Sequence, residues 1–257
     1  MRIHIIGGGN LGVALAKGFA LSAANHHITV TRRNIQHIAY LADLGIRLSR
    51  SNTDGISMAD VVLLCVKPHQ AAEVLVEIAP LIRKKVLLSA VTGFSTDEIK
   101  AISGDEVSIV RIMPNIAAQY GESATCVAAN GTFDQTLSVV HDLLEEVGTV
   151  IPIEEKLMDA ATVLGACGTA FALRYIRASM QAGIEIGFDA HTALSIASQT
   201  AKGAAMMALC EQAHPEQLID RVTTPQGCTI VGLNEMEHQG FSSSLIRGIR
   251  TSLLKIK

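Results

Sequence analysis

The stretch that decides the fold is MRIHIIGGGNLGVALAKGFAL, residues 1–21. Its apolar run, Ile3 to Ile6, leads directly into the pattern Gly-x-Gly-x-x-Gly formed by Gly7, Gly9 and Gly12. In a strand-turn-helix unit the first glycine allows the tight turn, the second lets the backbone approach a pyrophosphate, and the third lets the helix pack on the strand. The pattern therefore predicts a dinucleotide site, with a purely structural glycine turn as the alternative.

The surrounding sequence favours the dinucleotide site. An amphipathic segment, 13–21, follows the glycines, and a second strand-like run, 28–31, lies where the next strand should be. We expect Asn10 and Leu11 to bind the cofactor together with the glycines, because free amides at a helix N-terminus face the phosphates.

The residues at the end of the second strand indicate which dinucleotide binds. An NAD site usually carries Asp or Glu there, whereas this chain has Thr31, Arg32 and Arg33. An arginine fork accepts a 2′-phosphate that a carboxylate would repel. NADPH is therefore the expected cofactor, with NADH left open. The alternative is that both arginines belong only to a solvated turn.

Further cofactor contacts are expected where later strands end, because ligands of such sheets lie at the carboxyl edge. The expected residues are Asn52, Val66, Lys67, Pro68, Ala90, Val91 and Thr92. The side chain of Lys67 is equally typical of an ordinary surface lysine. Asn115 follows another strand, where it either turns a polar amide toward the same edge or caps a turn.

Bulk properties are those of a cytoplasmic enzyme. The 257 residues carry a net charge of -3, with a pI near 6.3, so neither nucleic acid nor an anionic membrane is expected as a partner. The five cysteines are an odd number without a CxxC pair, which predicts reduced thiols and no metal site. The chain passes from Met1 straight into the first strand, so no signal peptide is expected.

The sequence divides into two halves, and we expect an α/β fold with a Rossmann-type, doubly wound sheet in residues 1–152 and an all-α domain in residues 153–257. Apolar runs rich in Val, Ile and Ala predict further strands of a mainly parallel sheet at 61–66, 86–91, 107–112, 124–128 and 149–153. Helical patterns cover 157–164, 170–186, 190–210, 215–222, 229–237 and 243–254.

Three residues of the second half are expected at helix starts. Asp189 and Ser242 are predicted caps, and Pro215 is predicted to open a helix. The most apolar stretch, 160–183, contains two arginines and two early glycines, and we therefore expect it not to span a membrane. The mean hydropathy of +0.34 instead suggests apolar helices buried in a subunit interface.

The most specific stretch of the second half is HPEQLIDRVTTPQGCTIVGLN, residues 214–234. Together with the glycine pattern, Val66-Lys67-Pro68, the run 111–115 and the run 155–160, it resembles the pyrroline-5-carboxylate reductase family over nearly the whole chain. The resemblance implies a Rossmann domain followed by a helical domain that pairs with a second subunit. A homo-oligomer built on a dimer unit is expected, with higher assemblies left open.

The resemblance also implies a small-molecule substrate whose carboxylate is held by the amides and hydroxyl of the turn 225–229. It places Thr229 as the catalytic candidate and Glu155, Cys228 and Thr229 at the substrate. From the residues alone, Thr229 could instead be a helix N-cap, and Glu155 could merely begin a helix. No strong catalytic acid stands out, so holding cofactor and substrate at reacting distance would carry most of the catalysis.

The chain departs from the family pattern at several loops. Gly165-Ala166-Cys167-Gly168-Thr169-Ala170-Phe171 replaces Ser-Gly-Ser-Gly-Pro-Ala-Tyr, and Ile116-Ala117-Ala118 replaces Thr-Pro-Ala. Gln226 stands where the family has a glycine, which is awkward if that position needs a positive φ.

The leading hypothesis is reduction of Δ1-pyrroline-5-carboxylate to L-proline. One alternative is a related imine or hydroxyacid dehydrogenase, although the helix after residue 157 lacks the lysine base of the hydroxyacid enzymes. The other alternative is a non-catalytic NADP-binding regulator.

Overall fold

The computed structural model describes residues 1–129 and 134–256. The chain forms two compact units, which we describe separately: Met1–Thr169 with Leu253–Lys257, and Ala170–Ser252. The boundary expected at residue 152 falls at the end of the last strand, whereas the first compact unit continues to Thr169.

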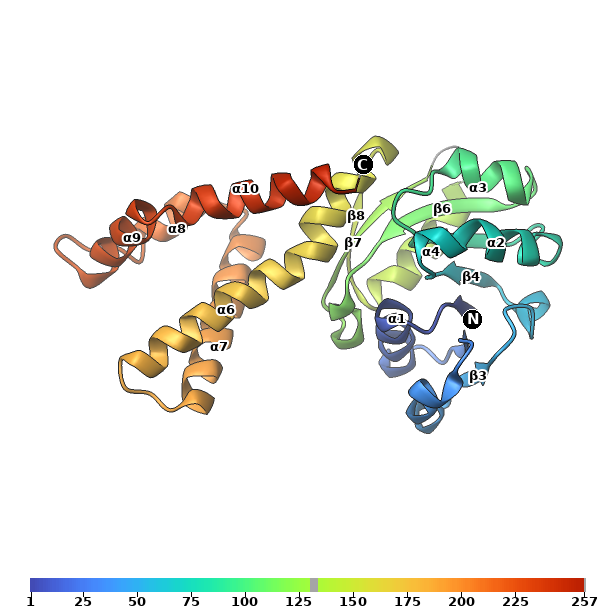
Figure 1. Ribbon diagram of the computed structural model, residues 1–257, viewed down its shortest axis with the longest axis horizontal. Helices are drawn as coiled ribbons and strands as arrows, with labels where there is room; N and C mark the ends of the chain where they lie inside the picture. Colours follow the sequence, from blue (N-terminus) through green and yellow to red (C-terminus); the bar gives the residue numbers. More distant parts are fainter. Residues whose placement is uncertain (130–133, 257) are drawn as a thin grey trace. The chain divides into compact units, whose positions relative to one another are not determined.

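The first unit contains a single sheet within the described residues, with eight strands in the order β3-β2-β1-β4-β5-β6-β7-β8. All neighbouring strands are parallel except β6 and β7, which are antiparallel. Figure 1 shows the sheet with helices beside it. The strands are β1 Arg2–Ile6, β2 His27–Thr31, β3 Arg47–Ser49, β4 Val61–Leu64, β5 Val86–Ser89, β6 Ser108–Met113, β7 Ser123–Ala128 and β8 Gly148–Pro152.

Both faces of this sheet are buried, which explains why the strands read as continuous apolar runs. Successive side chains of a strand point to opposite faces, so Val61 and Leu63 belong to one core and Val62 and Leu64 to the other. Covering the two faces requires helices on both sides. The predicted doubly wound sheet is therefore confirmed.

Helices of this unit cover both faces of the sheet. On one face pack α1 (Asn10–Leu21), η1 (Ile35–Leu44) and α4 (Asp134–Glu145), with Phe19 fully buried. On the other face pack α2 (Pro68–Ile78) and α3 (Thr96–Ser103). The remaining helical segments of this unit are η2 Ile56–Met58, η3 Ala79–Leu81, η4 Ile116–Tyr120, η5 Glu155–Leu157, α5 Met158–Ala161 and the π-helical η6 Thr162–Cys167.

One strand, β3 (Arg47–Ser49), was not predicted from the sequence. β3 has three residues, too few to show alternation, and it pairs only with β2 at the end of the sheet. The strands that were expected lie within two residues of their predicted bounds. The sheet order places the ends of β1 and β4 side by side, where the winding of the sheet changes direction and where a ligand is expected.

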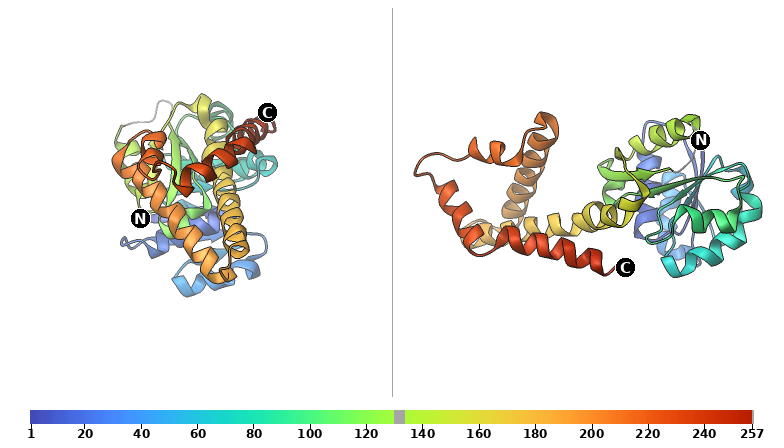
Figure 2. Two further views of the ribbon diagram at one scale, coloured as in Figure 1. Left: turned by 90° about the vertical axis from the view of Figure 1, so that its left-hand side faces the viewer. Right: turned by 90° about the horizontal axis from the view of Figure 1, so that it is seen from above.

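The second unit is all helical within the described residues, as expected (Figure 2). Its helices are α6 Gly168–Glu185, which begins in the first unit, α7 Ala190–Glu211, α8 Pro215–Asp220, α9 Cys228–His238 and α10 Phe241–Leu254. α6 and α7 lie close together near their connecting turn at Gly183. A methyl group at this glycine would lie only 2.9 Å from Cβ of Ala193.

Two of the three expected helix starts are confirmed. Asp189 caps α7 by accepting hydrogen bonds from the amides of His191 and Thr192, and Pro215 opens α8. The cap expected at Ser242 is wrong, because Ser242 lies inside α10 and its hydroxyl donates to Glu237.

The second unit exposes many large apolar side chains. Ile186, Leu209 and Val231 are 77%, 70% and 66% exposed. The helical stretch Glu155–Glu185 is also long and apolar enough to cross a membrane by length and composition, and only 17% of its apolar window is buried. Length and composition do not decide whether this stretch spans a membrane, so the expectation that it does not stays a prediction.

Candidate functional site

A cavity of about 1060 Å³ lies in the first unit, beside the ends of β1, β2, β4 and β5. It brings together residues from five loops that were predicted from separate parts of the sequence. The expected cofactor residues that line it are Gly7, Gly9, Asn10, Leu11, Thr31, Arg32, Arg33, Asn52, Val66, Lys67, Pro68, Ala90 and Thr92.

Two expected cofactor residues do not line the cavity. Val91 is 1% exposed and packs in the core beneath α2 and α3. Gly12 lies behind the loop, where a methyl group would come within 2.2 Å of the Gly7 carbonyl oxygen. Gly12 therefore serves the packing of helix on strand, which is the role expected for the third glycine.

The other two glycines of the pattern also have distinct physical roles. Gly7 has φ +106°, and a methyl group there would lie 2.6 Å from the carbonyl oxygen of Cys65. Gly9 has ordinary backbone angles, and its missing side chain faces open space with no atom within 4 Å. Gly7 is needed for the turn itself, whereas Gly9 leaves room for a ligand to reach the backbone.

The N-terminus of α1 is suited to an anion. Gly9 is its N-cap and offers no side-chain oxygen, and the first turn contains no acidic residue. The amides at this end are thus not capped by a side chain, and the helix dipole adds partial positive charge. A pyrophosphate fits this cradle, as the sequence pattern predicted.

The basic end of the cavity lies at the ends of β2 and β3. Arg32 is half-buried and donates from Nη1 to the carbonyl oxygen of Gly8 at 2.7 Å, whereas Arg33 is exposed. Arg50 and Ser51 also line the cavity and were not predicted from the sequence. The signal that would have found them is the short strand β3, which ends just before Arg50.

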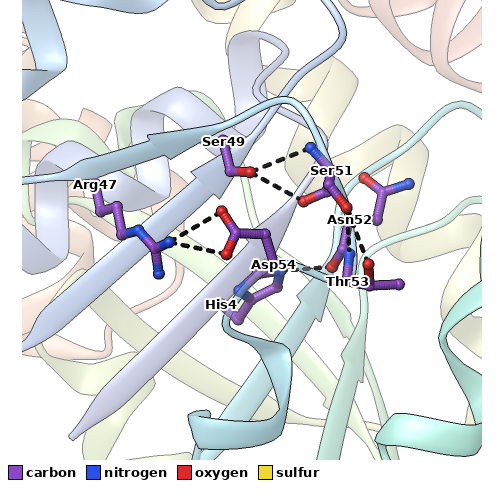
Figure 3. A network of polar contacts seen from close by, with 7 residues as sticks. All are labelled: His4, Arg47, Ser49, Ser51, Asn52, Thr53 and Asp54. Atoms are coloured by element: carbon purple, nitrogen blue, oxygen red, sulfur yellow. Dashed lines mark hydrogen bonds and ion pairs between the residues drawn. The ribbon is translucent and has the colours of Figure 1, made fainter.

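Asn52 links this end of the cavity to the sheet. Its side chain accepts from the Thr31 hydroxyl at 2.8 Å and donates to Glu77 at 2.8 Å. The backbone carbonyl oxygen of Asn52 lies 2.9 Å from Nε2 of His4, a histidine only 1% exposed (Figure 3). Burial lowers the pKa of His4, so the neutral ring, protonated on Nε2, is the form that donates to Asn52.

The loop after β4 contributes Cys65, Lys67 and Pro68. Desolvation raises the pKa of the Cys65 thiol to about 12, so the thiol stays protonated and is no nucleophile. Pro68 occupies the first turn of α2, where a missing amide hydrogen costs nothing, and exposed Lys67 is the N-cap residue.

Glu155 begins η5, and its carboxylate is held by two residues of the same unit, Thr96 and Arg111. Its Oε1 accepts from the Thr96 amide at 2.7 Å, the Thr96 hydroxyl at 2.9 Å and Nη1 of Arg111 at 3.2 Å. Burial would raise the pKa of Glu155, but the bonds from Thr96 and Arg111 outweigh it and lower the pKa. This contact pattern is that of a structural anchor, so a role of Glu155 at the substrate stays a prediction.

The turn 225–229 belongs to the second unit. The N-cap of α9 is Gly227, which has no side chain, so Thr229 lies at the second helical position and is not the cap considered above. Thr229 is half-buried and Cys228 is exposed. Gln226 has φ +58°, which is the left-handed conformation that a glycine at this position would adopt freely.

Asn115 has a structural role. Its Oδ1 accepts from the Ala117 amide at 2.9 Å, which caps η4, and its Nδ2 donates to the Gly165 carbonyl at 3.3 Å. The turn-cap alternative considered for Asn115 is therefore the one that the structure shows.

Comparison with known proteins supports the reading of both halves. Residues 155–257 match the model of the pyrroline-5-carboxylate reductase dimerisation family. Residues 2–93 match the model described as NADP oxidoreductase, coenzyme F420-dependent.

Relatives extend the likeness over the full chain. Pyrroline-5-carboxylate reductase 1 of Dictyostelium discoideum is 42% identical over 97% of this chain, which spans only 48% of that protein. Pyrroline-5-carboxylate reductase 2 of the same organism is 41% identical, covering 99% of this chain and 91% of the relative. The crystal structure of a Plasmodium falciparum pyrroline carboxylate reductase with NADP bound is 26% identical, with a TM-score of 0.89 over 100% of this chain and 97% of that one.

The fold, the cavity and these matches define an oxidoreductase with an NADP-binding domain followed by a helical dimerisation domain. More specifically, the chain belongs to the pyrroline-5-carboxylate reductase family. The family resemblance seen in the sequence is thereby confirmed. A dimerisation domain implies a homo-oligomer, which accounts for apolar side chains left exposed in a single chain.

Proposed function

We propose that the protein reduces Δ1-pyrroline-5-carboxylate to L-proline with NADPH as the hydride donor. The observation that carries the proposal is the family match over both halves, together with a cavity that places the glycine loop and the arginines on one sheet edge. When bound, NADPH supplies a hydride that, with a proton on the ring nitrogen, converts the C=N bond of the substrate into the C–N bond of proline.

The residues of the chain bind and orient the cofactor in this proposal. The amides after Gly9 hold the pyrophosphate, and the arginines that follow β2, Arg32 and Arg33, select the 2′-phosphate. Ala90 and Thr92 follow β5 and line the cavity beyond the glycine loop, which is the direction expected for the nicotinamide. Positioning supplies most of the rate enhancement.

Thr229 is the residue that we assign to the substrate, with Cys228 beside it. Because Gly227 is the N-cap of α9, the hydroxyl of Thr229 does not cap the helix. Thr229→Ala is expected to lower kcat/KM for pyrroline-5-carboxylate by roughly ten- to a hundredfold, the loss for one hydrogen bond to a charged group. Thr223→Ala, in the same loop, should keep full activity, since its hydroxyl bonds to the Asp220 carbonyl. Equal losses in both variants would remove Thr229 from the substrate site.

The test of the reaction follows the hydride. Protein incubated with pyrroline-5-carboxylate and NADPH deuterated at the transferable position should yield proline that carries one deuterium, detected by mass spectrometry. Unlabelled proline, or no proline, would refute the proposal.

We further propose that the oligomer is built on a dimer unit in the cytoplasm, with the apolar helices paired between subunits and not inserted in a membrane. All five cysteines are free thiols, in keeping with a reducing compartment. Sedimentation should give a dimer or a multiple of it without detergent. A stable folded monomer at micromolar concentration, or a requirement for detergent, would contradict this assembly.

A further inference from the structure

The pairing of β2 with β3 places Arg50 beside the arginines that follow β2. In this parallel pair Thr31 lies opposite Ser49, and the amide of Arg32 donates to the Ser49 carbonyl at 3.0 Å. Arg50 is the next residue after Ser49. Neighbouring strands lie about 4.8 Å apart, so the Arg32-Arg33 turn and Arg50 leave the sheet side by side.

The three arginines differ in how they are engaged. Arg32 is half-buried, and its guanidinium donates to the Gly8 carbonyl at 2.7 Å, which ties the glycine loop to the end of β2. Arg33 and Arg50 are exposed and line the cavity. Within the described residues, neither of their side chains takes part in a hydrogen bond or ion pair with another residue.

The backbone around Arg50 is fixed although its side chain is free. The Ser49 hydroxyl accepts from the Ser51 amide at 3.1 Å, across Arg50. Arg47, before this turn, pairs with Asp54 at 2.8 Å (Figure 3). Asn52, after it, accepts from the Thr31 hydroxyl at 2.8 Å. The nearby carboxylate of Glu77 already accepts from Asn52 at 2.8 Å. A guanidinium on a rigid turn loses little backbone freedom when it binds an anion.

We propose that Arg50 and Arg33 form the clamp that selects the 2′-phosphate of NADP, and that Arg32 is a positioning residue for the glycine loop. The inference rests on the cofactor part of the proposed function and changes its residue assignment. Two planar guanidinium groups can each offer paired donors to a phosphate. Arg32 already uses Nη1 for its bond to the Gly8 carbonyl, whereas the donors of Arg33 and Arg50 are all available within the described residues.

The experiment uses adenosine 2′,5′-bisphosphate and AMP as probes, with calorimetry on the full-length protein. Arg50→Ser and Arg33→Ser should each weaken the bisphosphate by at least about tenfold, or 1.4 kcal/mol, and change AMP by less than about twofold. Arg50→Lys should lose less than Arg50→Ser, because it keeps the charge but not the fork. Arg32→Ser should weaken both probes together. Exposed Arg83, which does not line the cavity, provides the control Arg83→Ser, with no effect expected.

The result that overturns the inference is an Arg50→Ser variant, folded by its melting curve, that binds both probes like the parent or loses both alike. Selective loss of the bisphosphate in Arg32→Ser alone would also overturn it. Neither probe carries a nicotinamide, so the outcome does not depend on turnover. Selective loss in a protein that does not reduce pyrroline-5-carboxylate would support the clamp and refute the proposed reaction.

Discussion

Alanine substitutions at three glycines distinguish an effect on cofactor binding from an effect on helix packing. Gly9 is the N-cap of α1, and Gly12 and Gly18 lie within the helix. In Gly12→Ala the new methyl group would lie 2.2 Å from the Gly7 carbonyl oxygen, and in Gly18→Ala 2.3 Å from the Ala118 carbonyl oxygen. Such overpacking costs about 1–3 kcal/mol. The higher helix propensity of alanine offsets up to about 1 kcal/mol of this cost. In Gly9→Ala nothing lies within 4 Å, and the cost is about 0.5–1 kcal/mol for a poorer N-cap.

Two measurements on each variant make the comparison. The melting temperatures of Gly12→Ala and Gly18→Ala should fall by several degrees, since a loss of 1 kcal/mol in stability corresponds to about 2–4 °C in a unit of this size. Binding of NADP⁺ should weaken by at least about tenfold in Gly9→Ala, because its methyl group enters the space reserved for the pyrophosphate. Gly18→Ala should bind NADP⁺ normally below its melting temperature.

The reasoning would be refuted by a Gly9→Ala variant with unchanged NADP⁺ affinity. That result would show that the phosphates do not approach the backbone at Gly9. A Gly12→Ala variant as stable as the parent would show, separately, that the loop relaxes at no cost.

Three further predictions concern stability. The fold lowers the pKa of Glu155 below its usual 4.5, so the stability that the charged carboxylate contributes is present above pH 4.5 and is lost as the pH falls through the lower folded value. Glu155→Gln should therefore lower the free energy of unfolding by about 2 kcal/mol at pH 7 and by less in acid. Equal losses of unfolding free energy at both pH values would contradict this. The fold also lowers the pKa of His4 below its usual 6.5, which favours the neutral ring, so the unfolded chain binds one more proton and stability falls as the pH drops below 6.5. Urea unfolding of His4→Gln should show a smaller loss of stability over this pH range. A variant with the same pH profile as the parent would exclude His4 as the cause. Gln226→Val should destabilise relative to Gln226→Gly by about 1–2 kcal/mol, because φ is +58°, and equal melting temperatures would argue against the left-handed turn.

Much of the cofactor site could be predicted because it rests on local rules. Each of Gly7, Gly9 and Gly12 has a role set by the turn it makes, and parallel strands bring their carboxyl ends to one edge. The loops at Val66 and Ala90 reach the cavity for that reason, although they are far apart in sequence.

What could not be predicted depends on contacts between distant residues. Arg50 follows a strand of three residues that carries no periodic signal, and the bond from Arg32 to Gly8 joins residues on different loops. Glu155 looked like a substrate residue through the family resemblance, yet its bonds to Thr96 and Arg111 require the fold to be seen. Thr229 lost its capping alternative only because the helix begins one residue earlier than the pattern suggested.

The most direct test of the central claim is a steady-state comparison of substrates and cofactors with the purified protein. Oxidation of NADPH is followed with pyrroline-5-carboxylate, with other cyclic imines and with 2-keto acids, and the best substrate is repeated with NADH. The account predicts the highest kcat/KM for pyrroline-5-carboxylate with NADPH. Tight NADPH binding without turnover of pyrroline-5-carboxylate, or faster turnover of a keto acid, would contradict it.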